Sequence, residues 1–461
     1  MPRSAPPLII LAGCAILGIL LVAIPMLTHL DRGLGPDGIE YISLAKSLVE
    51  TGHFSRNAQR EPELHRTPGY PLLLMLVQPW RSTHHLLILF LSQLLMTLVT
   101  AYLLLLISRR MSTTRSSWLL APFLFLLNPI ILLMPFNVIA ETFFSLLCSL
   151  SLWLFSTSSG PSHTRRLALS GLTLGFAVLV RPVGLVLFPA LFLLGMQTSA
   201  SNGKSSKAPP LLPARRVVLV IIMSFLLLPT LWTVFNGIRN GYWGLSKTAI
   251  SFISSAYGPA YIHNDSKTFR DSKYDHGLSP LDALTEVYST IVHNPGTAFR
   301  SYLNGLARVI LGPGEWHLRR AVLGERGSRA NSGPISSVVM DNSNDGLNFR
   351  LITETESSGN RRGTQAIALV TWSLAVTLLT YAFAFRGLMR CFGSKGPIPV
   401  FCAAAAALLL TSVAGYEANA RFRVPAVPYL VLLASYGKPI PAMTFSRLRE
   451  RLRITKGRGG A

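Results

Sequence analysis

The sequence contains about ten apolar runs, each close to the length that an α-helix needs to cross a lipid bilayer. Backbone groups left unpaired in hydrocarbon are costly, so a run that crosses the bilayer is expected to be helical. A further apolar stretch, 71–80, is either a re-entrant segment or an eleventh span. The pattern therefore predicts an all-α polytopic membrane protein. The runs centre on residues 8–28, 84–107, 117–134, 138–156, 167–180, 183–197, 217–235, 365–385, 397–413 and 424–437.

The composition agrees with a membrane location, because only 14% of the 461 residues are charged, against about 25% in soluble proteins. The formal net charge of +23 is not a sign of nucleic-acid binding, which needs a basic face on a soluble domain. Here the basic residues lie in short clusters between apolar runs. The four cysteines form no CxxC pair and no metal-ligand cluster is visible, so we expect neither a disulfide framework nor a metal or other cofactor.

The basic clusters favour one orientation. With the N-terminus in the cytoplasm, the clusters at 109–115, 165–166, 204–216 and 386–395 and the basic tail all fall on the cytoplasmic side. That distribution follows the positive-inside rule. The run at 8–28 resembles a signal peptide, but no small-residue cleavage site follows it, so we expect it to remain as a helix. The prediction is a multi-pass protein of the plasma (inner) membrane.

Two segments on the predicted outer side, 31–83 and 236–364, are too long to be simple turns. Loops of this length often carry function or form a domain. Within the second, the apolar spacing over 285–309 predicts two packed helices divided at Asn294-Pro295-Gly296. The predicted organisation is a transmembrane module (1–235) containing the first outer loop (31–83), an extracytoplasmic region (236–364), C-terminal transmembrane helices (365–437) and a basic cytoplasmic tail (438–461).

The first outer loop is predicted to begin with an amphipathic helix. Asp37 is a candidate N-cap, apolar residues follow at helical spacing, and Gly52 ends the helix. Such a helix lies in the membrane interface, which would hold Asp37 at the level of the lipid headgroups. Taken alone, Asp37 is more readily explained as an ordinary capping residue of a surface helix.

The same loop ends in a rigid turn. Pro68 and Pro71 flank a Gly-Tyr pair and direct the chain back toward the membrane. His65 and Arg66 come just before this turn. We expect them at the mouth of any site formed there.

Five motifs follow one another along the chain: the acidic-x-x-x-Tyr helix of 37–41, Arg-x-Pro-Gly-Tyr-Pro at 66–71, Glu141 near the outer end of a span, the Gly-rich run 170–176 with Arg181-Pro182, and Arg-Phe-Arg-Val-Pro at 421–425. Each motif is moderately specific, and their joint order covers about residues 10–437. Together they resemble those of the C-type glycosyltransferase (GT-C) superfamily, and bacterial protein-mannosyltransferase-like and aminoarabinose-transferase-like enzymes are the most similar members. The chain departs from the pattern at Gly38, where many relatives carry an acid or Ser.

The resemblance implies a GT-C fold with about ten transmembrane helices, an amphipathic first outer loop and a large extracytoplasmic region. It also implies a hexosyl- or pentosyltransferase that uses a polyprenyl-phosphate-linked sugar donor. Transfer would proceed with inversion on the extracytoplasmic face, to a lipid, glycan or protein acceptor. The membrane lipids themselves would be the other partners, and no nucleic acid is expected.

Such a transfer needs a carboxylate to take the proton of the acceptor hydroxyl. It also needs cations at the leaving phosphate, a role that suits the two-pronged guanidinium group of Arg. We predict Asp37 and Glu40 as the catalytic carboxylates. The predicted phosphate-binding residues are His65, Arg66, Arg181, Arg421 and Arg423, and the predicted substrate-binding residues are Tyr41, Tyr70, Glu141 and Glu417.

Structural roles stay open for several of these residues. Arg181 alternatively caps the C-terminus of a helix, and Arg421 and Arg423 alternatively snorkel toward water. Tyr70 alternatively anchors the chain in the interface. Glu141, an ionisable group in an apolar run, alternatively pairs with one of the arginines instead of touching substrate.

Two other functions compete with sugar transfer. A transporter or flippase of lipid-linked sugars also needs outer arginines for phosphate, but no base. It needs a polar path across the membrane as well, and we find no acids in the cytoplasmic halves of the predicted spans. A non-catalytic partner in an envelope complex is the third hypothesis.

Overall fold

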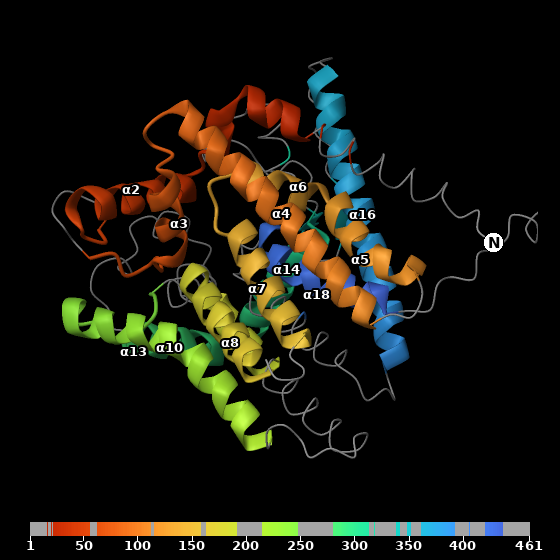
Figure 1. Ribbon diagram of the computed structural model, residues 1–461. Helices are drawn as coiled ribbons and strands as arrows, with labels where there is room; N and C mark the ends of the chain where they lie inside the picture. Colours follow the sequence, from red (N-terminus) through yellow and green to blue (C-terminus); the bar gives the residue numbers. More distant parts are fainter. Residues whose placement is uncertain are drawn as a thin grey trace, which may run out of the picture.

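A computed structural model describes residues 22–55, 62–111, 115–157, 163–190, 214–247, 280–312, 338–341, 348–351, 361–391 and 420–436, with the single residues 16, 20, 318 and 405. These residues are mostly helical (Figure 1), as the sequence predicts. The described strands are β1 (Val338–Asp341) and β2 (Asn348–Leu351), which pair antiparallel.

The described helices begin with a short 3-10 turn and end with the apolar helix α18. In chain order they are η1 (Leu30–Gly33), α2 (Pro36–Thr51), α3 (Gly69–Val77), α4 (Thr83–Met111), α5 (Arg115–Leu127), α6 (Pro129–Leu133), η2 (Met134–Phe136), α7 (Glu141–Ser156), α8 (His163–Val180), η4 (Pro182–Leu187), α10 (Ala214–Asn240), α13 (Pro280–His293), α14 (Pro295–Leu311), α16 (Arg361–Cys391), η7 (Ala420–Ala426) and α18 (Val427–Ser435).

Among the described residues, α4, α10 and α16 are long and apolar enough to cross a membrane. A fourth span results if the bent pair of helices over 118–136 is counted as one. At nine residues, α3 is about 13 Å long and cannot cross the bilayer by itself. The predicted spans at 8–28, 183–197 and 397–413 lie partly or mostly outside the described residues. The described helices within 138–156, 167–180 and 424–437 do not meet the length and apolarity that a span needs, so the total of about ten stays a prediction.

The bend between α5 and α6 has a local cause. Pro129 has no backbone N–H to donate to the preceding turn. Asn128 instead starts a new helix, because its side chain accepts a hydrogen bond from the N–H of Ile130 at 3.1 Å. The two helices meet at 62°. The chain that follows then passes beside η1, where the N–H of Val138 donates to the carbonyl of Gly33 at 3.1 Å.

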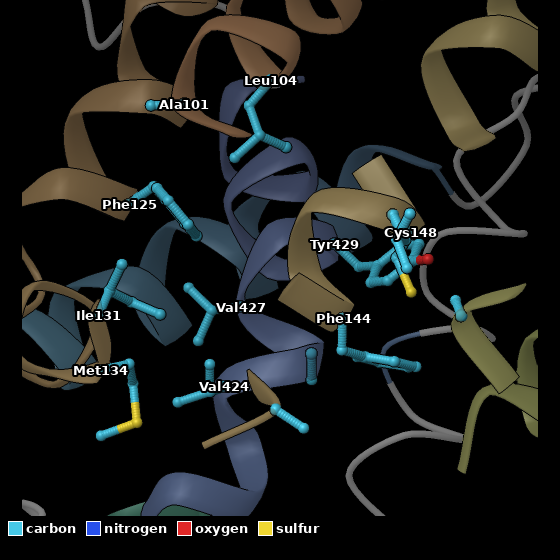
Figure 2. Packing of buried hydrophobic residues seen from close by; sticks show 14 of the residues in the cluster. Ala101, Leu104, Phe125, Ile131, Met134, Phe144, Cys148, Val424, Val427 and Tyr429 are labelled. Carbon is cyan, nitrogen blue, oxygen red and sulfur yellow. The ribbon is translucent and has the colours of Figure 1, made fainter. Parts of the chain in front are cut away.

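The last described segment lies at the centre of the hydrophobic core. Figure 2 shows Val427 and Tyr429 of α18 between α5 and α7, with Phe125 on one side and Phe144 on the other. α18 also packs against α16 and α4. The short helix η7 precedes α18 directly, so the core holds the residues of η7 in a fixed place beside α7.

Helices α8 and α10 cross at two glycines one turn apart. A Cβ on Gly171 would lie 2.1 Å from Ser224 Oγ, and a Cβ on Gly175 would lie 2.4 Å from the carbonyl oxygen of Phe225. Small residues four positions apart let two membrane helices approach closely. This packing accounts for the Gly-rich run in the sequence.

The helices expected at 285–309 are confirmed. α13 ends at His293 and α14 begins at Pro295, so the break falls at the predicted turn. The role of the whole segment 236–364 as an extracytoplasmic region stays a prediction.

The contact at Gly175 predicts a stability difference between two Gly→Ala variants. Gly175→Ala places a methyl group against backbone that cannot move unless α10 shifts, so we expect a loss of about 1–3 kcal/mol and a lower melting temperature in detergent. Gly296→Ala is the control, because no atom lies within 4 Å of the added carbon. Equal melting of Gly175→Ala and the wild type would contradict the packing described.

Candidate functional site

Asp37 lies in the first turn of α2 and is not its N-cap. The N-cap is Gly35, and Pro36 is the first helical residue. The N-cap expectation was wrong because Pro36, with its fixed φ, begins the helix two positions before the expected first helical residue. The predicted end is confirmed, since Gly52 closes α2 with φ of 70°.

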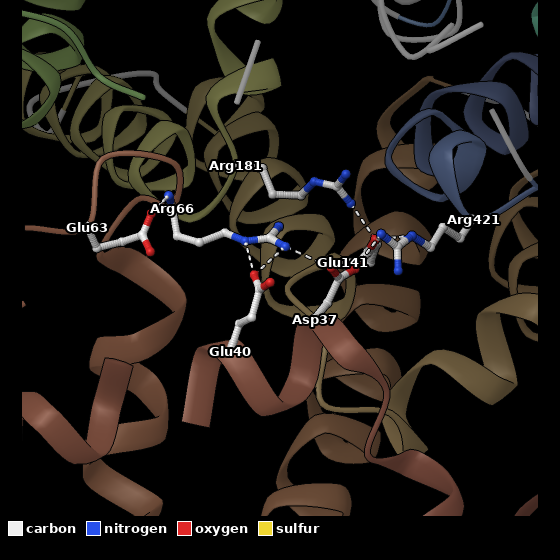
Figure 3. A network of polar contacts seen from close by, with 7 residues as sticks. All are labelled: Asp37, Glu40, Glu63, Arg66, Glu141, Arg181 and Arg421. Carbon is white, nitrogen blue, oxygen red and sulfur yellow. Dashed lines mark hydrogen bonds and ion pairs between the residues drawn. The ribbon is translucent and has the colours of Figure 1, made fainter. Parts of the chain in front are cut away.

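Two arginines from distant parts of the chain meet on the Asp37 carboxylate (Figure 3). Arg66 Nη2 lies 2.7 Å from Asp37 Oδ1, and Arg421 Nη2 lies 2.5 Å from Asp37 Oδ2. The side chain of Asp37 is 25% exposed. Each carboxylate oxygen therefore receives an N–H from a different guanidinium group, and the carboxylate is only partly open to water.

The two arginines continue into further ion pairs. Arg66 Nε and Nη2 donate to Glu40 Oε2 at 3.0 and 2.8 Å. On the other side, Arg421 Nε lies 3.5 Å from Glu141 Oε1, and Arg181 Nη1 lies 2.6 Å from the same oxygen. Three carboxylates alternate with three guanidinium groups. We call this set the ion-pair chain; in order, it consists of Glu40, Arg66, Asp37, Arg421, Glu141 and Arg181.

Glu141 is the most deeply buried member, with a side chain only 4% exposed. A buried carboxylate without a cation is strongly destabilising, so its two arginine neighbours are needed for the fold. The structural alternative for Glu141, pairing with arginine, is what the structure shows. A substrate contact of Glu141 stays a prediction.

The charges around Asp37 set its proton affinity. Burial raises the pKa of the carboxyl group, but the positive charges of Arg421 and Arg66 outweigh burial and hold the pKa well below its ordinary value. Asp37 is therefore ionised and a weak proton acceptor while both arginines hold it. Its basicity would rise if either guanidinium group moved to another anion.

The predicted tyrosines take different places. Tyr41 lies against the ion-pair chain, with Arg66 Cζ 5.1 Å from the centre of its ring. Tyr70 is fully buried behind Tyr41, and its hydroxyl donates to Gln93 Oε1 at 3.0 Å. Tyr70 thus lies in the core, which fits neither direct substrate binding nor an interfacial anchor.

The predicted roles of His65 and Glu417 stay predictions. His65 precedes Arg66 in the same loop, and its backbone carbonyl accepts a hydrogen bond from Ser246 Oγ at 2.5 Å. Glu417 lies outside the described residues.

Arg423 does not join the ion-pair chain. Its side chain is buried, and Nη1 donates to the carbonyls of Val309, Ile310 and Gly312 at the C-terminus of α14. Side chains two positions apart on a 3-10 helix, with three residues per turn, point in different directions. This is why Arg421 reaches Asp37 while Arg423 faces α14. The phosphate-binding role predicted for Arg423 therefore has no support from its position.

Sequence reasoning missed Glu63. Its side chain is buried, and Oε1 accepts hydrogen bonds from the backbone N–H groups of His65 at 2.5 Å and Arg66 at 2.9 Å. Figure 3 shows the Glu63 carboxylate beside the start of the Arg66 side chain. An isolated acid in a loop of unpredicted conformation gives no pattern from which this contact could be inferred.

The environment of Gly38 explains its departure from the family pattern. A Cβ at this position would lie 3.0 Å from both the Cβ and the carbonyl oxygen of Val138. An acidic side chain would require either α2 or the segment at Val138 to shift by a few tenths of an ångström. Within the described part of the chain, no group of three or more His, Cys, Asp or Glu side chains is arranged to hold a metal ion.

The fold is similar to that of a solved archaeal oligosaccharyltransferase. The archaeal oligosaccharyltransferase AglB from Archaeoglobus fulgidus, in complex with an inhibitory peptide and a dolichol-phosphate, matches with a TM-score of 0.51 and 15% identity, over 98% of this chain and 52% of AglB. The apo oligosaccharyltransferase of the same organism matches with a TM-score of 0.49 and 14% identity, over 99% and 52% of the two chains. ArnT from Cupriavidus metallidurans in the apo state gives 0.39 and 11%, over 91% and 78%.

The likeness to AglB supports the fold alone, because this chain spans about half the length of AglB at low identity. A family model described as GPI transamidase subunit PIG-U matches residues 65–267. No curated protein matches the chain.

The burial of Glu141 predicts a stability effect. Glu141→Gln removes the negative charge between Arg181 and Arg421, so we expect a loss of about 2–3 kcal/mol and a clearly lower melting temperature. Glu50→Gln is the matched control, because Glu50 forms an exposed pair with Lys46 at 3.8 Å and contributes little. Equal melting of the two variants would show that Glu141 is not held as an ion.

Proposed function

We propose that this membrane protein, which has the fold of the GT-C glycosyltransferases, transfers a sugar from a polyprenyl-phosphate donor to an acceptor. The observation that carries the proposal is the convergence of Arg66 and Arg421 on Asp37 from separate parts of the chain. The orientation inferred from the basic clusters puts this convergence on the extracytoplasmic side. The acceptor class, whether lipid, glycan or protein, is open.

The arginines would neutralise the leaving group. When the sugar leaves its carrier, the bond between the anomeric carbon and the phosphate oxygen breaks and its electron pair stays on the lipid phosphate. Arg66 and Arg421 can each donate two N–H groups to such a phosphate. Arg181, which shares Glu141 with Arg421, is another cation close enough to Arg421 to add positive charge near the phosphate.

The Asp37 carboxylate would act as the base for the acceptor hydroxyl. As the phosphate leaves, the acceptor hydroxyl attacks the anomeric carbon from the opposite face, and a new carbon–oxygen bond forms with inversion. The hydroxyl proton passes to Asp37. Glu40 binds Arg66 through two hydrogen bonds, so its proposed role is to orient Arg66.

These two roles are coupled by charge. Asp37 is a weak base while Arg66 and Arg421 hold it, because they keep its pKa low. A donor phosphate competes for the same guanidinium groups. As they turn toward the phosphate, the pKa of Asp37 rises and the carboxylate becomes able to accept a proton. Donor binding would therefore activate the base.

A second candidate function is a non-catalytic subunit that binds a glycolipid. The family model for a GPI transamidase subunit matches residues 65–267, which include Arg66, Glu141 and Arg181. The low pKa of Asp37 in its pairs with Arg66 and Arg421 also agrees with a site that binds an anionic headgroup through its arginines and transfers no proton. The flippase alternative has no comparable observation in its support.

Asp37→Asn separates these functions. The variant cannot accept the proton, so we expect transfer from a polyprenyl-phosphate sugar to fall by about 10²–10⁴-fold. Binding of dolichyl phosphate should be retained or become tighter, because the two arginines lose their carboxylate. Both are measured with purified protein in lipid nanodiscs, with Glu50→Gln as the control.

Equal transfer rates of wild type and Asp37→Asn would rule out Asp37 as the base. Binding without transfer in the wild type, with envelope-derived acceptors supplied, would favour the glycolipid-binding subunit.

The proposed role of Arg66 and Arg421 is tested by measuring the affinity of their variants for dolichyl phosphate. Arg66→Gln and Arg421→Gln each remove a charge-assisted contact, so we expect dolichyl phosphate to bind about tenfold more weakly or worse. Arg239→Gln is the matched control, because Arg239 is exposed at the end of α10. Unchanged affinity in both site variants would place the phosphate elsewhere.

A further inference from the structure

Each of the two arginines on Asp37 has a buried charged residue close to it in sequence. Glu63 lies three positions before Arg66, and Arg423 lies two positions after Arg421. Glu63 and Arg423 are 3% and 1% exposed. The contacts described for them are mainly with backbone groups, and neither is used in the chemistry proposed above.

Glu63 fixes the loop from which Arg66 extends. Its carboxylate binds the N–H groups of residues 65 and 66, and its own N–H donates to the carbonyl of Phe54 at 3.0 Å. The other side of the loop is bound by the segment after α10. There the N–H of Lys247 donates to the carbonyl of Leu64 at 2.8 Å, and Ser246 Oγ donates to the carbonyl of residue 65. The backbone at Arg66 is thus held from both sides.

Arg423 fixes the short helix from which Arg421 extends. Its Nη1 donates to the carbonyls of Val309, Ile310 and Gly312 at 3.3, 3.1 and 2.5 Å, and its Nη2 donates to Thr377 Oγ1 at 3.0 Å. A cation at the C-terminus of a helix is favoured by the unpaired carbonyls and the helix dipole. Arg423 therefore joins η7 to both α14 and α16.

We propose that Glu63 and Arg423 are positioning residues, which hold the backbone of Arg66 and Arg421 in place so that their guanidinium groups can reach the phosphate group of a lipid-linked substrate. The proposal rests on the proposed function, because it takes the two arginines to be the phosphate ligands. The physical reason is conformational entropy. A long side chain that must be ordered on binding lowers affinity, and a fixed backbone reduces that cost.

The test is a double-mutant cycle, because a residue that acts only through another has no effect once the other is removed. The measurement is the Kd of dolichyl phosphate for the full chain in nanodiscs. We expect the single variant Glu63→Ala to bind about three- to tenfold more weakly than the wild type. The double variant Glu63→Ala/Arg66→Gln should bind no more weakly than Arg66→Gln alone. Arg421 still binds phosphate in that background, so the Kd remains measurable.

The same cycle applies to Arg423→Lys, with and without Arg421→Gln. Lysine keeps the charge but cannot contact three carbonyls and Thr377 together, so the same three- to tenfold loss is expected. Glu63→Gln should bind like the wild type, because its amide oxygen still accepts both hydrogen bonds. Glu50→Ala and Arg239→Lys are the matched surface controls.

An equal loss in both backgrounds, or no loss in the wild type, would overturn the proposal. If Glu63→Ala does not fold, as judged by gel filtration and melting, Glu63→Asp takes its place, because its carboxylate is one methylene shorter. Failure of the wild type to bind dolichyl phosphate would overturn the proposed function itself. Loss of binding in Arg66→Gln but not in Glu63→Ala would leave the proposed function standing and reject only the positioning role.

Discussion

The pairing of Asp37 with two arginines is the interaction on which the site depends. Asp37 comes from α2, Arg66 from the loop after it, and Arg421 from η7. Because opposite charges that are partly shielded from water attract strongly, these pairs tie α2 and the loop after it to η7. Through Glu141, the same network also reaches α7 and Arg181.

The balance of charges in the ion-pair chain links phosphate binding to the basicity of Asp37. Within the ion-pair chain, the charges of three carboxylates balance those of three guanidinium groups. A lipid phosphate that enters must compete with carboxylates for the arginines, and the carboxylate that loses its partners becomes more basic. Phosphate recognition and base activation would then be one event. Sugar transfer uses both the phosphate site and the base, whereas glycolipid binding alone uses only the phosphate site.

Patterns along the sequence predicted the fold better than they predicted the roles of individual residues. Apolar periodicity and the motif order predicted the helical class and the GT-C fold, and the break between α13 and α14 was found from one Asn-Pro-Gly turn. Arg421 and Arg423 could not be distinguished, because residues two positions apart on a helix point in different directions and the sequence does not show which of them faces Asp37. Glu63 and the burial of Tyr70 depend on loop and tertiary contacts that no local pattern specifies.

In the proposed reaction, a lipid phosphate takes Arg66 and Arg421 away from Asp37. An experimental structure of the protein with dolichyl phosphate bound would test this step. We expect both guanidinium groups on the phosphate oxygens, with the Asp37 carboxylate released and facing the space where an acceptor would enter. A phosphate bound elsewhere, with both Asp37 pairs intact, would contradict it.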